Sequence, residues 1–174
     1  MADNRPDSVI PPPHRIIHQV YDPFEIPDPA TRAGQSVIGR LHDEPFIWLT
    51  TVDSAGVPHP LPVTFLYDPA TTTILTYSLP ESERGRLAHI RTNTNVALHF
   101  EGSGGDYIII TGEAQVSTGD PPADQLPAWV AKYKDLYPKL LGMTLARVAG
   151  AGTIPLRIRP LTLRYVANPS WSPA

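Results

Sequence analysis

The chain contains no cysteine among its 174 residues. This absence excludes disulfide bonds, a cysteine nucleophile and metal sites built on thiolates. It leaves the redox compartment open, because a chain without thiols is compatible with reducing and oxidising surroundings alike.

Long apolar runs and a large net charge are also missing. No run reaches the length of a membrane-spanning helix, and the N-terminal residues lack the apolar core of a signal peptide. The formal net charge of −3 gives no electrostatic basis for binding nucleic acid or an anionic membrane. With 41% hydrophobic and 18% charged residues, we expect a globular cytoplasmic protein that acts on a small molecule.

The motifs of several catalytic classes are absent as well. The sequence has no Gly-x-Ser-x-Gly elbow, no Walker loop and no Gly-x-Gly-x-x-Gly after a predicted strand. Of the six histidines, only His14 and His18 are four residues apart, and both lie in a proline-rich segment. We therefore expect no metal site.

Proline, in contrast, is abundant at 21 residues and unevenly distributed. Residues 1–33 are rich in proline and show little apolar periodicity, which predicts an extended arm that is either docked on another surface or disordered. We expect a single folded domain over residues 34–168 and a short tail over residues 169–174.

Apolar spacing predicts the elements of that domain. Strands are expected on both sides of a tight turn at Asp53–Gly56, where Gly56 supplies a positive φ, and then at 72–78, 95–101, 106–116, 153–159 and 161–166. Helices are expected at 35–42, 81–91, 122–141 and 144–148. About six mostly antiparallel strands with a few peripheral helices predict a mainly β fold, a small barrel.

One segment is a candidate anion site. All three lysines fall on the predicted helix 122–141, so a phosphate bound in the barrel must be held by arginine, hydroxyl or backbone groups. Ser78 ends a strand, and Arg84 and Arg86 begin the next helix, which is a suitable arrangement for holding phosphate. The alternative is a solvated helix start in which neighbouring glutamates pair with these arginines, and the sequence leaves both open.

Several motifs occur in a characteristic order along the chain. They are Trp48-Leu-Thr-Thr-Val52, Gly56-x-Pro58-x-x-x-Pro62-Val63, Tyr77-Ser78-x-Pro80, a basic residue, and Asn93-x-x-Val96-Ala-Leu-His99. This set resembles the pyridoxamine-phosphate-oxidase-like split β-barrel flavoproteins of the FMN-binding type. Within that family it is most similar to the branch that binds the deazaflavin coenzyme F420. The similarity runs from about Leu41 to Arg164.

The resemblance implies a set of cofactor contacts and a homodimer that shares its cofactor pocket. The implied cofactor-binding residues are Thr50, Thr51, Pro62, Val63, Thr64, Tyr77, Ser78, Arg84, Arg86, Leu87 and Asn93. Arg86 stands where the family usually has a phosphate-binding lysine, and Thr64 stands where it usually has a tryptophan. Trp129, Tyr133 and His99 are candidates to cover the ring or the substrate.

The resemblance further implies an oxidoreductase that transfers a hydride between reduced F420 and a hydrophobic conjugated molecule, such as an enone, quinone, tetrapyrrole or polyketide. Tyr133, Tyr165 and His99 are the candidate proton donors. Two alternatives stay open, namely an FMN-dependent oxidase or reductase of the same fold and a non-catalytic protein that binds a cofactor or ligand.

Overall fold

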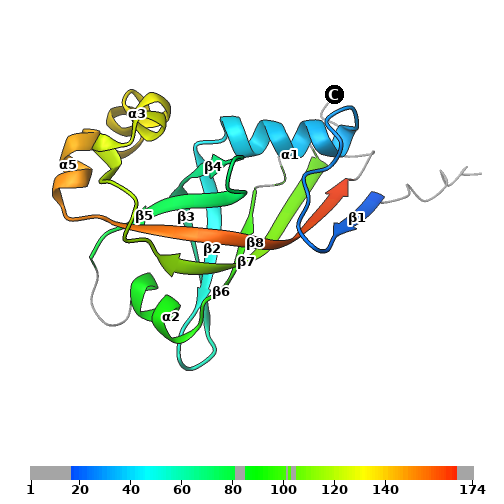
Figure 1. The fold of residues 1–174 in the computed structure, drawn as a ribbon, viewed down its shortest axis with the longest axis horizontal. Coiled ribbons are helices and arrows are strands. Elements are labelled where there is room, and N and C mark those ends of the chain that lie inside the picture. Colours follow the sequence, from blue (N-terminus) through cyan, green and yellow to red (C-terminus); the bar gives the residue numbers. More distant parts are fainter. Residues whose placement is uncertain (1–16, 81–84, 101, 103–104, 168–174) are drawn as a thin grey trace, which may run out of the picture.

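The computed structural model describes residues 17–80, 85–100, 102 and 105–167, and its main feature is one eight-stranded antiparallel sheet (Figure 1). The strands are β1 (Ile17–Tyr21), β2 (Phe46–Val52), β3 (Pro58–Thr64), β4 (Leu66–Asp68), β5 (Thr73–Ser78), β6 (Asn95–His99), β7 (Asp106–Val116) and β8 (Ile154–Ala167). Their order is β3-β2-β6-β7-β8-β5-β4, with β1 paired to β8. The mainly β, split-barrel fold expected from the sequence is confirmed.

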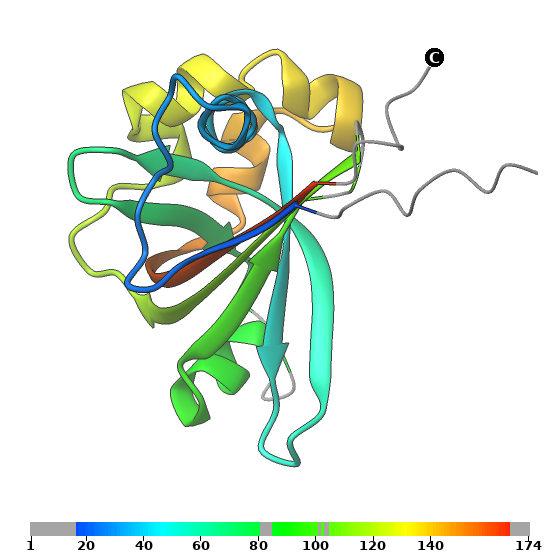
Figure 2. The ribbon, with the colours of Figure 1, turned by 90° about the vertical axis from the view of Figure 1, so that its right-hand side faces the viewer.

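Helices cover parts of this sheet. They are α1 (Arg32–Asp43), α2 (Arg86–Thr92), α3 (Pro127–Tyr133), α4 (Leu136–Leu141) and α5 (Leu145–Gly150), with a 3₁₀ turn, η2, at Ala123–Gln125. Figure 2 shows the sheet curled into a half-barrel, with α1 and the α3–α5 group in its upper half and α2 at its lower end. No helix within the described ranges is long and apolar enough to cross a membrane.

The predicted helix 122–141 is wrong as a single element, because the structure divides it into η2, α3 and α4. Proline explains both breaks. Pro127 is the first residue of α3, where its missing N–H costs nothing. Pro138 lies in the first turn of α4, and a helix continued from α3 would need its N–H to bond the carbonyl of Lys134.

The predicted pair of strands at 153–159 and 161–166 is also wrong, since β8 runs unbroken from Ile154 to Ala167. Pro160 cannot donate to a ladder, which is why the sequence predicts a break there. The register between β7 and β8 shifts at this point, so that Thr111 pairs with Thr162 while Gly112 pairs with Pro160. A β-bulge at Leu161 therefore accommodates the proline and keeps the strand continuous.

The strand β1 comes from the proline-rich arm that the sequence analysis placed outside the domain. Residues from Ile17 to Tyr21 pair in antiparallel register with β8, and the amide of Phe24 donates to the carbonyl oxygen of Leu161 at 2.7 Å. This part of residues 1–33 thus belongs to the sheet, while residues 1–16 and 168–174 lie outside the described residues.

Two clusters of buried side chains hold the fold together. The larger fills the half-barrel and includes Ile47, Leu98, Ile110 and Leu163, all 0% exposed. The smaller joins β5 to the α3–α5 group, and its centre is the fully buried Trp129. The alternate residues of β2, β6 and β7 that point away from the larger cluster are only half-buried or exposed. Eight of these residues form what we call the open face: Phe46, Trp48, Thr50, Ala97, His99, Tyr107, Ile109 and Thr111.

Candidate functional site

The edge strand β3 is bare on both of its faces. Every residue from Pro58 to Pro62 is exposed, whereas alternate residues of the neighbouring strand β2 are buried. An exposed edge strand of this kind is normally covered by a ligand, a partner or another part of the chain. The bare segment of β3 is therefore a candidate binding surface.

The free edge of β3 offers hydrogen-bond acceptors and no donors between Pro58 and Pro62. The amide of Asp53 donates to the carbonyl oxygen of Val57 at 3.0 Å, and this bond fixes the phase of the β2–β3 ladder. In that phase the backbone groups of residues 58, 60 and 62 face away from β2. All three residues are prolines, which carry a carbonyl but no N–H.

A polar pocket of about 340 Å³ opens between β3 and α2. It is lined by Thr51, Pro58, His59, Pro60, Leu61, Gly85, Arg86 and His89. Two of the predicted cofactor-binding residues, Thr51 and Arg86, are brought together here. Arg84, the other predicted arginine, lies outside the described residues.

The side chains of the polar pocket form a chain of contacts. Nε2 of His59 lies 2.9 Å from Oδ2 of Asp53, and this hydrogen bond is the largest of the effects that lower the pKa of Asp53. The ring of His59 lies against the ring of His89, with centroids 4.6 Å apart. Nδ1 of His89, in turn, lies 2.9 Å from the hydroxyl oxygen of Thr51. Two imidazoles and a guanidinium thus line a single small pocket.

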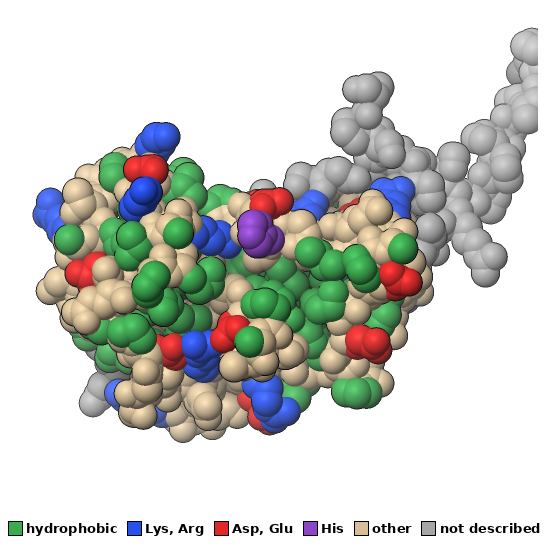
Figure 3. Space-filling model, turned by 45° about the horizontal axis from the view of Figure 1, so that its top comes forward, with side chains coloured by type: hydrophobic (Ala, Val, Ile, Leu, Met, Phe, Trp, Pro, Cys, Tyr) green, Lys and Arg blue, Asp and Glu red, His purple; other side chains and the backbone are tan. Residues whose placement is uncertain are grey.

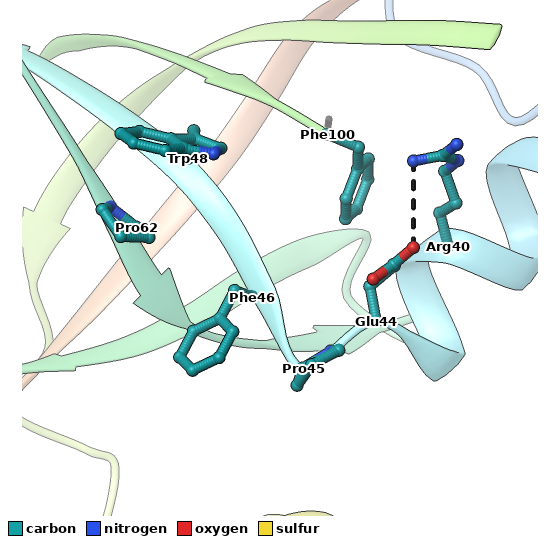
Figure 4. Close-up of a pocket in the computed structure, with 7 residues that line it drawn as sticks. All are labelled: Arg40, Glu44, Pro45, Phe46, Trp48, Pro62 and Phe100. Carbon is teal, nitrogen blue, oxygen red and sulfur yellow. Dashed lines mark ion pairs between the residues drawn. The ribbon is translucent and has the colours of Figure 1, made fainter. Parts of the chain in front are cut away.

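A second pocket, of about 320 Å³, lies by the open face near the other end of β3. Figure 4 shows the aromatic rings of Phe46, Trp48 and Phe100 around it, together with Pro62 and the Arg40–Glu44 ion pair, whose charged atoms are 3.8 Å apart. Trp48 also stacks on His99, with 5.9 Å between ring centroids and 9° between the ring planes. We call this the aromatic pocket.

The structure distributes the other predicted cofactor-binding residues over several places. Thr50 lies on the open face, whereas Val63 and Leu87 belong to the larger core cluster. Asn93 caps the end of α2, where its side-chain oxygen accepts from the amide of Asn95 at 3.1 Å. The hydroxyl of Ser78 is buried and has no hydrogen-bond partner among the described residues.

Thr64 and Tyr77 contact the helical group. The hydroxyl oxygen of Thr64 lies 3.0 Å from that of Tyr137. The ring of Tyr77 packs edge-on against Trp129, its hydroxyl donates to the carbonyl oxygen of Pro121 at 2.7 Å, and burial raises its pKa to about 12. These contacts occupy the side chain of Tyr77 within the protein.

Of the three predicted proton donors, the two tyrosines are occupied within the fold. Tyr133 is fully buried, its hydroxyl is bonded to the backbone of Phe65, and burial raises its pKa far above the usual value. Tyr165 donates to the carboxylate of Asp106 at 2.8 Å, and burial is the main cause that raises its pKa to about 12. His99 is the candidate on the open face, beside the aromatic pocket.

Comparisons with known proteins agree with this architecture. A family model described as pyridoxamine 5'-phosphate oxidase matches residues 37–154, which is more than half of the chain. The chain belongs to the pyridoxamine 5'-phosphate oxidase family. No curated protein matches the chain.

Solved structures share the family fold at low sequence identity. A protein from Listeria innocua, provisionally named a pyridoxamine 5'-phosphate oxidase, is 21% identical over 75% of this chain and 95% of its own, with a TM-score of 0.55. An FAD-binding protein from Mesorhizobium loti is 14% identical over 87% of this chain and 99% of its own, with a TM-score of 0.54. An F420 reductase is 18% identical over 72% of this chain and 94% of its own, also with a TM-score of 0.54.

Within this family fold, sequence reasoning missed the roles of His59 and Asp53 and gave His89 no assigned function. It assigned a role only to His99 and considered paired histidines only at helical spacing, whereas His59 and His89 are thirty residues apart. One signal was available, because the predicted hairpin around Gly56 places His59 opposite Thr51 in the register that the structure shows. The contact with His89 depends on how α2 packs against β2, which no local pattern predicts.

A third pocket, of about 610 Å³, has no residue of β3 in its walls. Its walls are Phe24, Glu25, Ile26, Ile38, Leu41, His42, Tyr67, Pro69 and Thr72, which come from the segment after β1, from α1 and from the β4–β5 hairpin. Figure 3 shows apolar side chains gathered among charged ones on the side of the molecule that carries α1. None of the residues predicted for the site lines this pocket.

Proposed function

We propose that the protein is an F420-dependent oxidoreductase that transfers a hydride between the reduced deazaflavin and a hydrophobic conjugated small molecule. The observation that carries the proposal is the exposed segment Pro58–Pro62, which has a polar pocket next to one part of it and an aromatic pocket next to the other. The two pockets lie on opposite faces of the β2–β3 pair, so a long cofactor with a planar ring and an anionic tail would contact both by crossing the free edge of β3.

The donor set of the polar pocket fits the phosphate of the tail. Arg86 supplies a guanidinium, and His59 and Thr51 supply further hydrogen-bonding groups around the same cavity. Charge-assisted hydrogen bonds from guanidinium to phosphate are among the strongest that proteins form. Arg86 keeps the positive charge that lysine usually supplies at this position of the family.

The free edge of β3 fits the ring. The pyrimidine part of a flavin or deazaflavin carries an N–H group that must be matched by an acceptor when it is removed from water. The carbonyl oxygens of Pro58, Pro60 and Pro62 are the groups this edge offers, and no competing N–H lies between them. The prolines also prevent another strand from pairing with this edge.

The bound deazaflavin would supply the hydride, and the aromatic pocket would supply the surroundings for the acceptor. Phe46, Trp48 and Pro62 give it apolar walls that exclude water from a conjugated substrate. His99, held against the ring of Trp48, is the residue we propose to deliver or hold the proton that must accompany the hydride.

We further propose that a second copy of the chain covers the open face and completes the cofactor groove. Tyr107 is 36% and Ile109 is 37% exposed on the central strand β7, an unusual position for large apolar side chains of a sheet. Across the sheet, Trp48 pairs with His99 and His99 pairs with Ile109, so that the apolar row is continuous with the aromatic pocket. A partner on this face would therefore close the pocket as well.

An FMN-dependent oxidase or reductase is the second candidate. The polar pocket contains one described arginine in about 340 Å³, which is enough for a single phosphate monoester. The two candidates differ in the tail of the cofactor, and binding measurements separate them.

Fluorescence titration of the purified protein with coenzyme F420 and with FMN tests the proposal. Micromolar or tighter binding of F420 with little binding of FMN is the expected result. Arg86→Ala should weaken the binding of F420. Arg91→Ala, on an exposed position of the same helix, is the control and should leave it unchanged. Preference for FMN selects the second candidate. Binding of neither cofactor contradicts both, and binding without oxidation of the reduced cofactor by any enone or quinone indicates a non-catalytic carrier.

A kinetic comparison tests the role of His99. Replacing it by Gln keeps the size and one hydrogen-bonding group but removes the titratable ring. We expect kcat to fall by about 10²-fold while the cofactor Kd stays the same. An unchanged kcat would remove His99 from the mechanism and leave water as the proton source.

A further inference from the structure

His59, which the proposed function places near the phosphate, is paired in the polar pocket with a second histidine, His89. The rings of His59 and His89 have centroids 4.6 Å apart and an angle of 35° between their planes. His59 comes from the edge strand β3 and His89 from α2, so the two are brought together only by the packing of that helix beside the hairpin.

Each imidazole is held in place by its own partner. Nε2 of His59 lies 2.9 Å from the carboxylate of Asp53. This carboxylate also accepts from the amides of Ala55 and Val57, so the turn fixes the position of the carboxylate. The hydroxyl of Thr51 holds Nδ1 of His89 at 2.9 Å. These contacts engage one ring nitrogen of each histidine and fix the orientation of both rings toward each other.

The groups around this pair include a single described carboxylate, that of Asp53. Within the part of the chain that the structure describes, the charged or titratable groups at the pocket are Asp53 from the β2–β3 turn, Arg86 from α2 and the two histidines. Glu81, Glu83 and Arg84 lie outside the described residues. Asp53 can balance one positive charge, but two imidazolium rings in contact, next to a guanidinium, repel each other unless an anion lies among them.

We propose that His59 and His89, together with Arg86, bind the phosphate group of the cofactor, and that this histidine pair takes up a proton when the phosphate binds. The inference rests on the proposed function for the identity of the ligand, since the shared chemistry is a phosphate attached to a flavin or deazaflavin. It adds to that function a linkage between pH and cofactor loading, because histidine is the side chain that gains a proton near neutral pH.

Isothermal titration calorimetry in buffers of different ionisation enthalpy measures the proton uptake. Coenzyme F420 is compared at pH 7.5 with its phosphate-free deazaflavin core, since the phosphodiester of F420 does not itself titrate near neutral pH. If the protein prefers FMN, FMN is compared with riboflavin at the same pH, above the second ionisation of the phosphate. Proton uptake with the phosphate-bearing ligand alone supports the proposal, and equal uptake with both ligands overturns it.

Two variants assign the effect to the histidine pair. His59→Gln, at a half-exposed side chain, and His89→Gln, at a buried one, are each expected to abolish the proton uptake and to weaken the phosphate-bearing ligand about tenfold. Affinity for the phosphate-free ligand should not change, which shows that the variants are folded. His42→Gln, on an exposed position of α1, is the matched control. Wild-type proton uptake in both site variants would overturn the proposal.

A measurement that needs no cofactor separates failure of this inference from failure of the proposed function. Titration with inorganic phosphate at pH 7.5, followed by NMR of the histidine ring signals, is expected to shift the signals of His59 and His89 and not those of His42. This shift supports the histidine site even if neither F420 nor FMN binds. Binding of F420 with no response of either histidine overturns the inference and leaves the proposed function standing.

Discussion

The hydroxyl of Tyr133 is bonded to both backbone groups of Phe65. It donates to the carbonyl oxygen at 2.7 Å and accepts from the amide nitrogen at 2.8 Å, and it also lies 2.9 Å from the carbonyl oxygen of Pro45. One phenol from α3 thereby satisfies the backbone at the point where the chain leaves β3 and enters β4. The α3–α5 group is attached to the sheet through this side chain.

Replacing Tyr133 by Phe should destabilise the protein by about 1 to 3 kcal/mol, because it leaves a buried amide and a buried carbonyl without partners. Urea unfolding followed by tryptophan fluorescence measures the change. The matched control is Tyr21→Phe, whose hydroxyl is bonded to the exposed side chain of Gln19, and here we expect a change below about 0.5 kcal/mol. Equal effects of the two substitutions would show that the hydrogen bonds of the Tyr133 hydroxyl do not stabilise the fold.

Lys132 predicts an unusual alkaline pH dependence of stability. Its ammonium group is buried without a hydrogen-bond partner in the described part of the chain and lies 4.1 Å from the centroid of the Phe65 ring. Burial lowers its pKa from 10.5 to about 8, against the opposing effect of Asp43 and Glu44. Between those two values the unfolded chain binds more protons than the folded one, so this group makes stability rise with pH.

Replacing Lys132 by Met should therefore stabilise the protein by about 1 kcal/mol at pH 7, where the buried charge is costly. It should also remove the increase of stability between about pH 8 and pH 10.5 that Lys132 causes. Urea unfolding at pH 7, 8.5 and 9.5 measures both effects. Lys134→Met, an exposed neighbour, is the control and should leave the rise intact. Loss of stability at pH 7 in the Lys132 variant would mean that the cation–π contact outweighs the desolvation of the charge.

The pair formed by Asp120 and Arg157 predicts sensitivity to acid. Nε and Nη2 of Arg157 donate to the two carboxylate oxygens of Asp120 at 2.8 and 2.6 Å, and the pKa of Asp120 is lowered chiefly by these hydrogen bonds. A carboxylate with a lowered pKa contributes stability above its ordinary value of 3.8, and this contribution is lost as the pH falls.

Asp120→Asn should cost about 1 to 3 kcal/mol at pH 7, and the difference from the wild type should shrink between about pH 4 and pH 2. Thermal or urea unfolding across this range measures it. Glu113→Gln breaks the exposed ion pair with Arg159 and should cost less than about 0.5 kcal/mol. A constant difference between the Asp120 variant and the wild type at every pH would contradict the linkage.

A charge placed on the open face at β7 should prevent the proposed dimer from forming. Ile109→Glu should convert the proposed homodimer to a monomer, because the carboxylate would be desolvated at the interface, and cofactor affinity should fall with it. Size-exclusion chromatography with light scattering measures the mass. Leu140→Glu, at a 45% exposed position on α4, is the control and should not change it. A wild-type protein that elutes as a monomer would contradict the shared pocket.

The sequence by itself determined the features that depend on neighbouring residues. Alternating apolar residues predict β2, β6 and β7, and Gly56, with its φ of 83°, predicts the hairpin turn that the structure contains. The prolines at 58, 60 and 62 determine, from covalent chemistry alone, that one edge of β3 has no N–H donors between Pro58 and Pro62. Even the error at residues 122–141 has a local cause, since the effect of Pro138 was readable from the sequence.

Only the tertiary structure decided the features that join distant segments. The pairing of His59 with His89, the bonding of Tyr133 to Phe65 and the addition of β1 to β8 each bring together residues that no spacing rule relates. The physical reason is that these contacts follow from the packing of whole elements, whose apolar faces fix the geometry, while the polar side chains at their margins meet as a consequence. The candidate site consists of polar side chains at the edges of β2, β3 and α2, which is why the sequence predicted the fold more completely than the site.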